Sequence, residues 1–181
     1  MLETIMTFPT PETAYASHQA VWNALKREDG VKRNFLFRVV PSRQSGLSLI
    51  KIRSLEMPEN IKPITCHKPE SGSHYQFSLL AHPVKRISGQ EYALKTEAEV
   101  KSWLEMQLER NGMNLVSCCI EFIPAIPLGK KKFNISLHAV EIHGRLLIIN
   151  AHKAESAMIE GIGRCKSMGF GMLELKEIDN A

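Results

Sequence analysis

Residues 161–173 read GIGRCKSMGFGML, and they place Arg164 and Lys166 among closely spaced glycines: Gly161, Gly163, Gly169 and Gly171. Glycine permits positive φ and lets a ligand approach the backbone closely. Successive backbone N–H groups can then surround an anion, and the two cations add positive charge at the same place. A phosphate group would satisfy these features. A tight turn between a helix and a strand, without a ligand, explains the glycines equally well.

The same stretch does not fit the nucleotide-binding motifs. The dinucleotide fingerprint G-x-G-x-x-G would need a third glycine where Lys166 stands, and it should follow a strand rather than a helical segment. The P-loop pattern G-x-x-x-x-G-K-[ST] fails as well, because lysine and methionine stand five places after Gly161 and Gly163. We therefore expect no cofactor.

The cysteines and histidines show no metal-binding spacing. The chain contains no Cys-x-x-Cys or His-Glu-x-x-His motif, and the side chains of His138 and His143 would diverge on a strand. We expect neither a bound metal nor a disulfide framework, and a reducing cytoplasm fits this cysteine usage. The cysteines are Cys66, Cys118, Cys119 and Cys165.

The charge distribution suggests a polyanion as partner. The formal net charge is +4, and the basic residues form separated clusters at 26–27, 32–38, 85–86, 130–132 and 153–166. An ordinary solvated surface is the alternative. The apolar runs are too short to span a bilayer and the N-terminus does not resemble a secretory signal, so we expect a cytoplasmic protein.

Tyr15 and His18 are three residues apart in a segment whose apolar positions, Ala14, Val21 and Leu25, follow a helical stripe. Residues at this spacing lie on one face of a helix. Histidine suits proton transfer because its unperturbed pKa is near neutral. A lone histidine beside an apolar stripe is more often a core residue, so the spacing alone does not decide the role of His18.

The elements that must position these residues fall into two groups. The first half reads as a strand at 2–8, a helix from Ala14 that ends at Gly30, strands at 35–40 and 48–54, and a loop at 57–72. The second half reads as a long strand at 75–87 and a helix begun by a Thr96–Glu99 capping box. A strand at 116–126, a hairpin at His143–Gly144, a helix at 154–162 and a strand at 172–178 follow.

This order is β-α-β-β-α-β in the second half and the front part of the same unit in the first half. We therefore predict an α+β protein with two tandem ferredoxin-like (RRM-like) domains and antiparallel sheets. The predicted domains are 1–72, which carries the helix with Tyr15 and His18, and 73–181, which carries the glycine-rich stretch. Trp22 and Trp103 lie on apolar helical stripes and are expected in the core.

Several segments, in the same order, resemble a known family. GIGRCKSMGFGML resembles the C-terminal glycine-rich motif of the repeat-associated RNA-binding proteins of CRISPR systems, in the form found in CasE-type endoribonucleases. YASHQAVWNAL, RNFLFRV, FSLLAHPVKRI and VKSWLEMQLERNGM resemble the family's first helix, next strand, central strand and following helix. His82 stands where asparagine is common, and the chain is short around 57–72 and 124–133.

The resemblance implies metal-independent cleavage of CRISPR repeat RNA through attack of a ribose 2′-OH, which leaves a 2′,3′-cyclic phosphate and a 5′-OH. It implies that His18 is catalytic, as acid or base, with Tyr15 beside it. The implied partners are the repeat RNA hairpin, the mature crRNA and other subunits of a Cascade-like complex. A non-catalytic crRNA-binding subunit is the alternative, and a metal-dependent nuclease is disfavoured because no carboxylates cluster in the sequence.

The expected RNA contacts lie mainly in the glycine-rich stretch, apart from the chemistry at Tyr15 and His18. Lys166, Arg164 and the glycines of the stretch would bind phosphates, with Lys153 as a further candidate. The remaining candidates are a basic hairpin at Lys130, Lys131 and Lys132, which would enter the groove of the RNA stem, and Arg33 and Arg38 beside an apolar strand.

Overall fold

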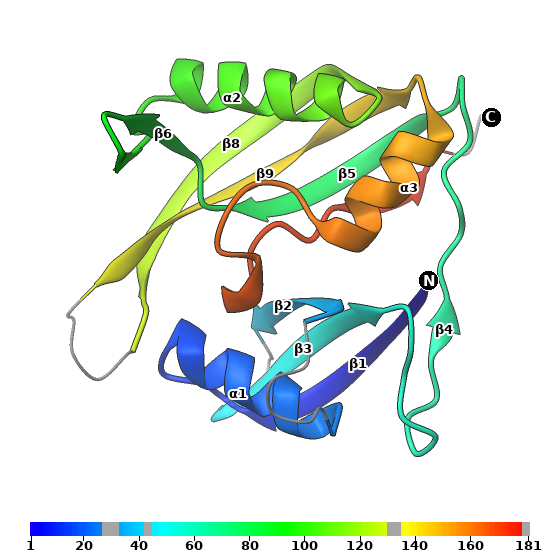
Figure 1. Ribbon diagram of the computed structural model, residues 1–181, viewed down its shortest axis with the longest axis vertical. Coiled ribbons are helices and arrows are strands. Elements are labelled where there is room, and N and C mark those ends of the chain that lie inside the picture. Colours follow the sequence, from blue (N-terminus) through cyan, green and yellow to red (C-terminus); the bar gives the residue numbers. More distant parts are fainter. Residues whose placement is uncertain (27–32, 42–44, 130–134, 179–181) are drawn as a thin grey trace.

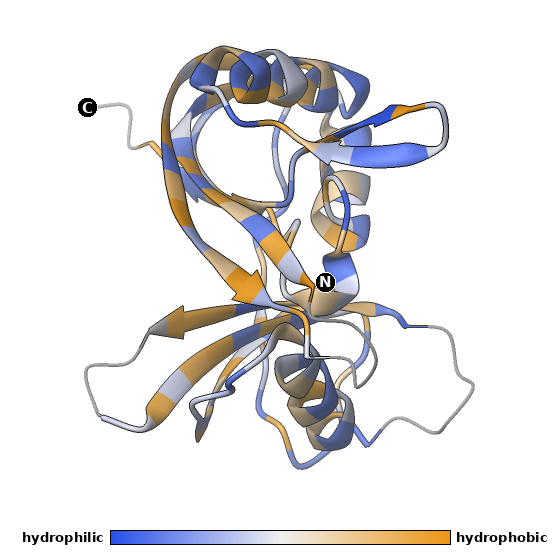
Figure 2. Ribbon diagram, turned by 90° about the vertical axis from the view of Figure 1, so that its left-hand side faces the viewer, coloured by the Kyte–Doolittle hydropathy of each residue, from blue (hydrophilic) through white to orange (hydrophobic). Residues whose placement is uncertain are grey.

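The computed structural model describes residues 1–26, 33–41, 45–129 and 135–178, which form two four-stranded sheets and a small separate hairpin (Figure 1). Neighbouring strands in both sheets are antiparallel. Hydrophobic and hydrophilic residues alternate along the long strands (Figure 2), as expected of sheets with one face in a core. The chain has the predicted α+β fold of two tandem ferredoxin-like units.

The first unit is one helix on a sheet, and its elements are β1 (Leu2–Pro9), α1 (Ala14–Ala24), β2 (Phe35–Pro41), β3 (Leu47–Ser54) and β4 (Ile64–Thr65). The strand order is β2-β3-β1-β4. Thr13 begins α1, because its hydroxyl accepts a 3.1 Å hydrogen bond from the backbone N–H of Ala16. Val21 then packs α1 onto Phe37 and Ile52 of the sheet.

The second half of this unit is reduced, as the sequence predicts. Residues 55–63, all of them described, form a loop without a helix. β4 pairs with β1 through Ile64 and Thr65 alone. The first helix ends at Ala24, capped by Leu25, so the predicted end at Gly30 is wrong; Gly30 itself lies outside the described residues. One helix, α1, therefore covers the first sheet in the described part of this unit.

The second unit is a four-stranded sheet with two helices on one face (Figure 1). Its elements are β5 (His74–Ala81), β6 (Val84–Ile87), β7 (Gln90–Ala93), α2 (Glu97–Arg110), β8 (Met113–Pro127), β9 (Ser136–Ile148), α3 (Ala151–Glu160), the 3₁₀ turn η1 (Lys166–Met168) and β10 (Glu174–Glu177). The sheet order is β10-β5-β9-β8. The Thr96–Glu99 capping box is confirmed, because the Thr96 hydroxyl and the Glu99 backbone N–H each make a 3.2 Å hydrogen bond to the other residue.

The single long strand predicted at 75–87 is wrong. β5 ends at Ala81, and residues 84–93 form a separate hairpin of β6 and β7. Pro83 explains the break, because proline cannot donate a hydrogen bond to the next strand of a sheet. The chain therefore leaves the sheet at His82–Pro83 before it enters α2.

The hairpin predicted at His143–Gly144 is also wrong, because β9 runs through both residues. β8 carries a register shift between Leu115 and Ser117, opposite this point. A Cβ atom on Gly144 would lie 2.0 Å from the Ser117 carbonyl oxygen. Glycine is thus needed for close approach at a bulge rather than for a turn. The connection between β8 and β9 lies at 128–135, only partly within the described residues.

Arg53 of β3 joins the two units. Its side chain is 2% exposed and donates hydrogen bonds to the backbone carbonyls of Met158 (2.9 Å) and Leu173 (2.7 Å) in the second unit. It also donates a 2.7 Å hydrogen bond to the Glu3 carboxylate of β1. A buried guanidinium is stable only when such partners satisfy its donors. The contact therefore fixes the second unit against the first sheet.

Lys51, two residues before Arg53 on β3, extends this interface. Its amine lies 3.0 Å from Glu3 and 3.2 Å from Glu174 of β10. Burial alone would raise the pKa of the Glu3 carboxyl, but Arg53 and Lys51 hold that pKa below its ordinary value of 4.5. This part of the stability is present above the unfolded pKa of Glu3 and is lost as pH falls through the lowered folded value.

Replacement of Arg53 should destabilise the whole chain. Arg53→Met leaves the Glu3 carboxylate and two buried carbonyls without their donor, so we expect a loss of about 3–5 kcal/mol in the free energy of unfolding. The measurement is denaturant unfolding followed by circular dichroism. Lys68→Met is the control, because Lys68 is 77% exposed in its ion pair with Glu155 and should change stability by less than about 1 kcal/mol. Equal losses in the two variants would contradict the assignment.

Candidate functional site

Tyr15 and His18 lie side by side on α1, with their ring centroids 6.2 Å apart and their planes 28° apart. The buried stripe of α1 consists of Ala14, Ser17 and Val21. His18 is only partly buried and lies outside that stripe. His18 is therefore a partly exposed residue at the edge of the core, and its catalytic role stays a prediction.

Aromatic rings surround His18 on the protein side. The ring of Trp22 lies 5.6 Å from that of His18, and the buried Phe35 of β2 lies 6.2 Å away on a nearly parallel plane. Phe35 also contacts Trp22 at 5.9 Å in an edge-to-face arrangement. These contacts hold the imidazole in place, which is what proton transfer at a fixed substrate atom requires.

Lys166 approaches this site from the opposite end of the sequence. It is the first residue of η1, which lies against α1 and β2. The sequence-based expectation that the glycine-rich stretch lies apart from Tyr15 and His18 is therefore wrong. Burial lowers the pKa of the Lys166 amine, Glu160 opposes this shift, and the positive charge of Arg33 adds to it.

Arg33 is the second cation of the site. Its guanidinium lies 5.8 Å from the centroid of the Phe35 ring and donates a hydrogen bond to the Phe35 carbonyl. Burial lowers the pKa of Arg33. Phe35 thus contacts both His18 and Arg33. Two partly buried cations near one another repel, and a bound anion would relieve that repulsion.

A histidine, a phenol and two cations thus gather around the junction of α1, β2 and η1. The imidazole can move a proton, the phenol can donate or accept a hydrogen bond, and the cations can stabilise negative charge that develops on a substrate. These are the groups that phosphodiester cleavage requires. Sequence reasoning missed the closeness of Arg33 to Lys166, because no local pattern connects the two residues.

The glycines of the stretch mainly allow the chain to turn and pack. Gly161 and Gly171 have φ of 77° and 80°, are buried, and donate their N–H groups to the carbonyls of Ala157 and Leu80 at 2.8 Å. A Cβ on Gly171 would lie 2.4 Å from the Ile162 carbonyl oxygen. Because these N–H groups are bound within the protein, the structure favours the turn over the expected phosphate cradle at both positions.

Gly169 and Gly163 pack in the same way against aromatic rings. A Cβ on Gly169 would lie 3.0 Å from Phe37 of β2, and one on Gly163 would lie 3.0 Å from Trp103 of α2. The partly buried Trp103 packs against the core of the second unit, as predicted. The glycines therefore let η1, which begins at Lys166, pack against α1 and β2.

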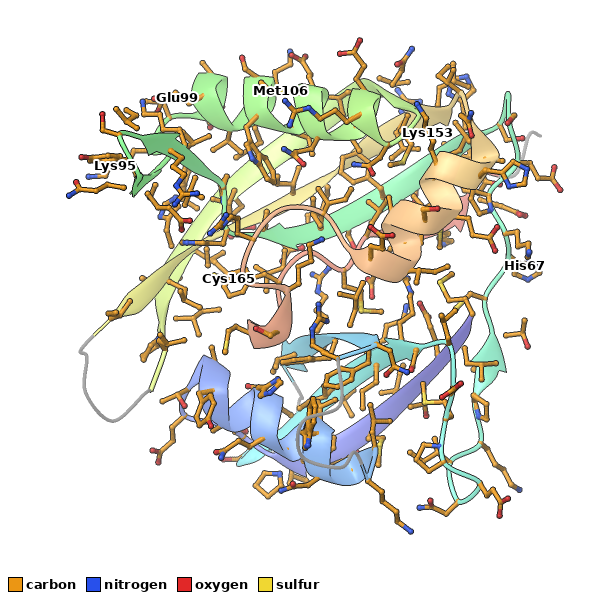
Figure 3. All side chains as sticks on the ribbon, viewed as in Figure 1. His67, Lys95, Glu99, Met106, Lys153 and Cys165 are labelled. Carbon is orange, nitrogen blue, oxygen red and sulfur yellow. The ribbon has the colours of Figure 1, made fainter. Side chains whose placement is uncertain are left out.

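Other candidate contacts lie elsewhere. Arg164 is exposed and forms an ion pair with Glu91 of β7. Lys153 is exposed in the first turn of α3, well away from Cys165 beside η1 (Figure 3). Arg38 contacts Glu141 of β9 at 2.5 Å and is only 14% exposed, so the structure favours an interdomain contact over the expected RNA contact. The predicted basic hairpin of Lys130, Lys131 and Lys132 lies outside the described residues.

Two features concern metals and membranes. Within the described ranges, no three His, Cys, Asp or Glu side chains are grouped so that they could hold a metal ion. No helix in the described part of the chain is both long enough and apolar enough to cross a bilayer.

Comparison with known proteins identifies relatives along nearly the whole chain. Residues 10–177 match the model of the CRISPR associated protein family. The chain is 27% identical over 188 aligned residues to CRISPR-associated endoribonuclease Cse3 of Thermus thermophilus, covering 89% of each chain. It is 25% identical over 181 residues to the CRISPR system Cascade subunit CasE of Escherichia coli, covering 89% of this chain and 90% of that protein.

A solved structure supports the same relationship. The structure of CRISPR endoribonuclease Cse3 bound to a 19-nucleotide RNA matches this fold with a TM-score of 0.83 and 25% identity. The match covers 97% of this chain and 100% of that one. Both ferredoxin-like units and their relative placement are therefore common to the two proteins.

The packing role of the glycines can be tested at Gly171. Gly171→Ala adds a Cβ at positive φ that also collides with the Ile162 carbonyl, so we expect a loss of about 2 kcal/mol or more in unfolding free energy. Gly72→Ala is the matched control, because φ there is 86° and no atom lies within 4 Å of the added Cβ. It should cost only the backbone strain, about 1 kcal/mol. Denaturant unfolding compares the two, and an equal loss would refute the close packing.

Proposed function

Because the chain belongs to the CRISPR associated protein family, we propose that it is an endoribonuclease of the CasE type that cleaves CRISPR repeat RNA without a metal ion. The observation that supports the proposal is that α1, which carries Tyr15 and His18 side by side, packs against η1, which begins at Lys166. The relative from Thermus thermophilus, which aligns over 89% of the chain, is an endoribonuclease and supports RNA cleavage as the reaction.

The proposed reaction is attack of a ribose 2′-OH on the adjacent phosphate. A base removes the 2′-OH proton, the 2′-oxygen bonds to phosphorus, and the bond to the 5′-oxygen of the next nucleotide breaks as an acid protonates that oxygen. His18 takes one of these two proton-transfer roles, and Tyr15 orients it or hydrogen-bonds the phosphate. Lys166 and Arg33 stabilise the additional negative charge on the phosphoryl oxygens. The products are a 2′,3′-cyclic phosphate and a 5′-OH.

We further propose that the protein remains bound to the mature crRNA in a Cascade-like effector complex in the cytoplasm. The Escherichia coli relative, a Cascade subunit, supports this assignment. Lys130, Lys131 and Lys132 are proposed to contact the RNA stem. Residues 1–72 would form the domain with the catalytic helix and residues 73–181 the domain with the glycine-rich stretch. A crRNA-binding subunit that does not cut is the alternative, and Tyr15 and His18 favour the enzyme.

Cleavage in the presence of EDTA tests the mechanism. The purified protein should cut its cognate repeat hairpin in EDTA, and a 2′-deoxy nucleotide before the cut should abolish cleavage because the nucleophile is missing. His18→Ala should slow single-turnover cleavage by about 100-fold or more while RNA binding survives. His67→Ala is the control, because His67 is an exposed loop residue (Figure 3). A requirement for Mg²⁺, or full activity in His18→Ala, would disprove the mechanism, and binding without cleavage would support the alternative.

The two lysines at opposite ends of the α3–η1 segment make a second test. Lys166→Ala removes the cation that faces the reacting phosphate, so we expect slower cleavage and a salt dependence of binding that is shallower by about one ion. Lys153→Ala removes an exposed lysine at the far end of α3 and should leave the cleavage rate within about twofold of wild type. Single-turnover cleavage and filter binding at several salt concentrations measure both effects. Equal losses in the two variants would contradict the placement of the phosphate at Lys166.

A further inference from the structure

The outer face of α1 carries a shallow hollow of about 320 Å³, which we call the α1 hollow, lined by Tyr15, His18, Gln19, Trp22 and Asn23. The other four residues follow Tyr15 by three, four, seven and eight positions, so all five share one face of the helix. This volume is at the lower end of the range seen for small-ligand sites, and it is enough for a planar nucleobase. It extends from the proposed catalytic pair along α1.

The residues that line the α1 hollow suit a base rather than a phosphate. Apart from the imidazole of His18, none of them can carry a charge near neutral pH, and neither Lys166 nor Arg33 lines the hollow. Gln19 and Asn23 are exposed amides, and each offers both donors and an acceptor. Proteins that hold unpaired nucleotides combine aromatic stacking surfaces with side chains that hydrogen-bond base edges.

Trp22 can act as a stacking surface because its orientation is fixed before any ligand binds. The indole is partly buried, so some of its surface remains accessible in the α1 hollow. Its edge-to-face contact with the buried Phe35 and its contact with His18 hold the ring in place. A rigid ring loses little conformational entropy when a base stacks on it. Trp22 was expected in the core, and it contributes to the core and to the α1 hollow at once.

We propose that the α1 hollow binds the nucleobase of a nucleotide next to the scissile phosphate. Trp22 stacks on the base, and Gln19 and Asn23 hydrogen-bond its edge. The inference rests on the proposed function, because it takes His18 as the residue at the reacting phosphate. His18 lines the same hollow, so a phosphate there places a neighbouring base over Trp22. This subsite determines which base is accepted beside the cut.

Fluorescence of a base analogue tests the subsite without cleavage. Repeat hairpins carry 2-aminopurine immediately before or after the cut, and a 2′-deoxy sugar before the cut prevents reaction. On binding wild-type protein, the fluorescence should fall by about half or more at one of the two positions, because stacking quenches it. Trp22→Leu should lose this quenching and should bind the RNA about tenfold more weakly. Wild-type binding with no quenching at either position, or undiminished quenching in Trp22→Leu, would overturn the proposal.

The two amides give a test that does not depend on the packing of Trp22. The full-length Gln19→Ala/Asn23→Ala variant and wild type are assayed on hairpins with each of the four bases at the quenched position. Wild type should prefer one base by about tenfold in kcat/KM, and the variant should lose most of that preference. Gln107→Ala on α2 is the matched control and should keep the preference. Equal preference in the double variant and in wild type would refute base reading by the amides.

These outcomes separate the two proposals. A wild-type protein that does not cut any hairpin contradicts the proposed function. A protein that cuts in EDTA through His18, but shows no quenching and no loss of base preference in the variants, contradicts the base subsite alone. Should Trp22→Leu fail to fold, as judged by circular dichroism and thermal melting, the amide variant decides the outcome.

Discussion

The structure depends on the buried guanidinium of Arg53. This side chain leaves the first sheet and binds the carbonyls of Met158 and Leu173, which lie at the end of α3 and just before β10. Those carbonyls cannot be satisfied by water at this depth, so the two units must keep one relative position for the hydrogen bonds to persist. Glu3 and Lys51 surround the contact with opposite charges. A polar interface of this kind fixes geometry more strictly than apolar surfaces that can slide.

The chemistry of the site follows from that fixed geometry. The chain between Met158 and Leu173 contains the glycine-rich stretch, so both ends of this stretch are attached to the first unit through Arg53. Its glycines allow close packing against Leu36 and Phe37 of β2, which leaves η1 beside α1. Lys166 consequently begins a turn that packs against the helix carrying Tyr15 and His18. At Gly161 and Gly171 the backbone N–H groups are already bound to carbonyls of the protein.

Local patterns predicted the parts of the fold that local forces decide. The cap at Thr96 was evident because a cap and its partner lie within one helical turn. The interpretation of Gly144 as a turn failed because the same residue type also serves opposite a bulge, and the bulge belongs to a different strand. The hairpin of β6 and β7 was missed because only two residues separate the end of β5 from the start of β6, so the two strands read as one.

The sequence by itself determined the fold class, the family and the shared helical face of Tyr15 and His18, because helix periodicity and collinear motifs are properties of neighbouring residues. Only the tertiary structure decided that Lys166 lies close enough to Arg33 to interact with it and that Arg38 is held by Glu141. It also decided that Trp22 lines a hollow as well as a core. These arrangements depend on contacts between residues far apart in the chain, and the balance of burial and charge at those contacts exists only once the two units have packed together.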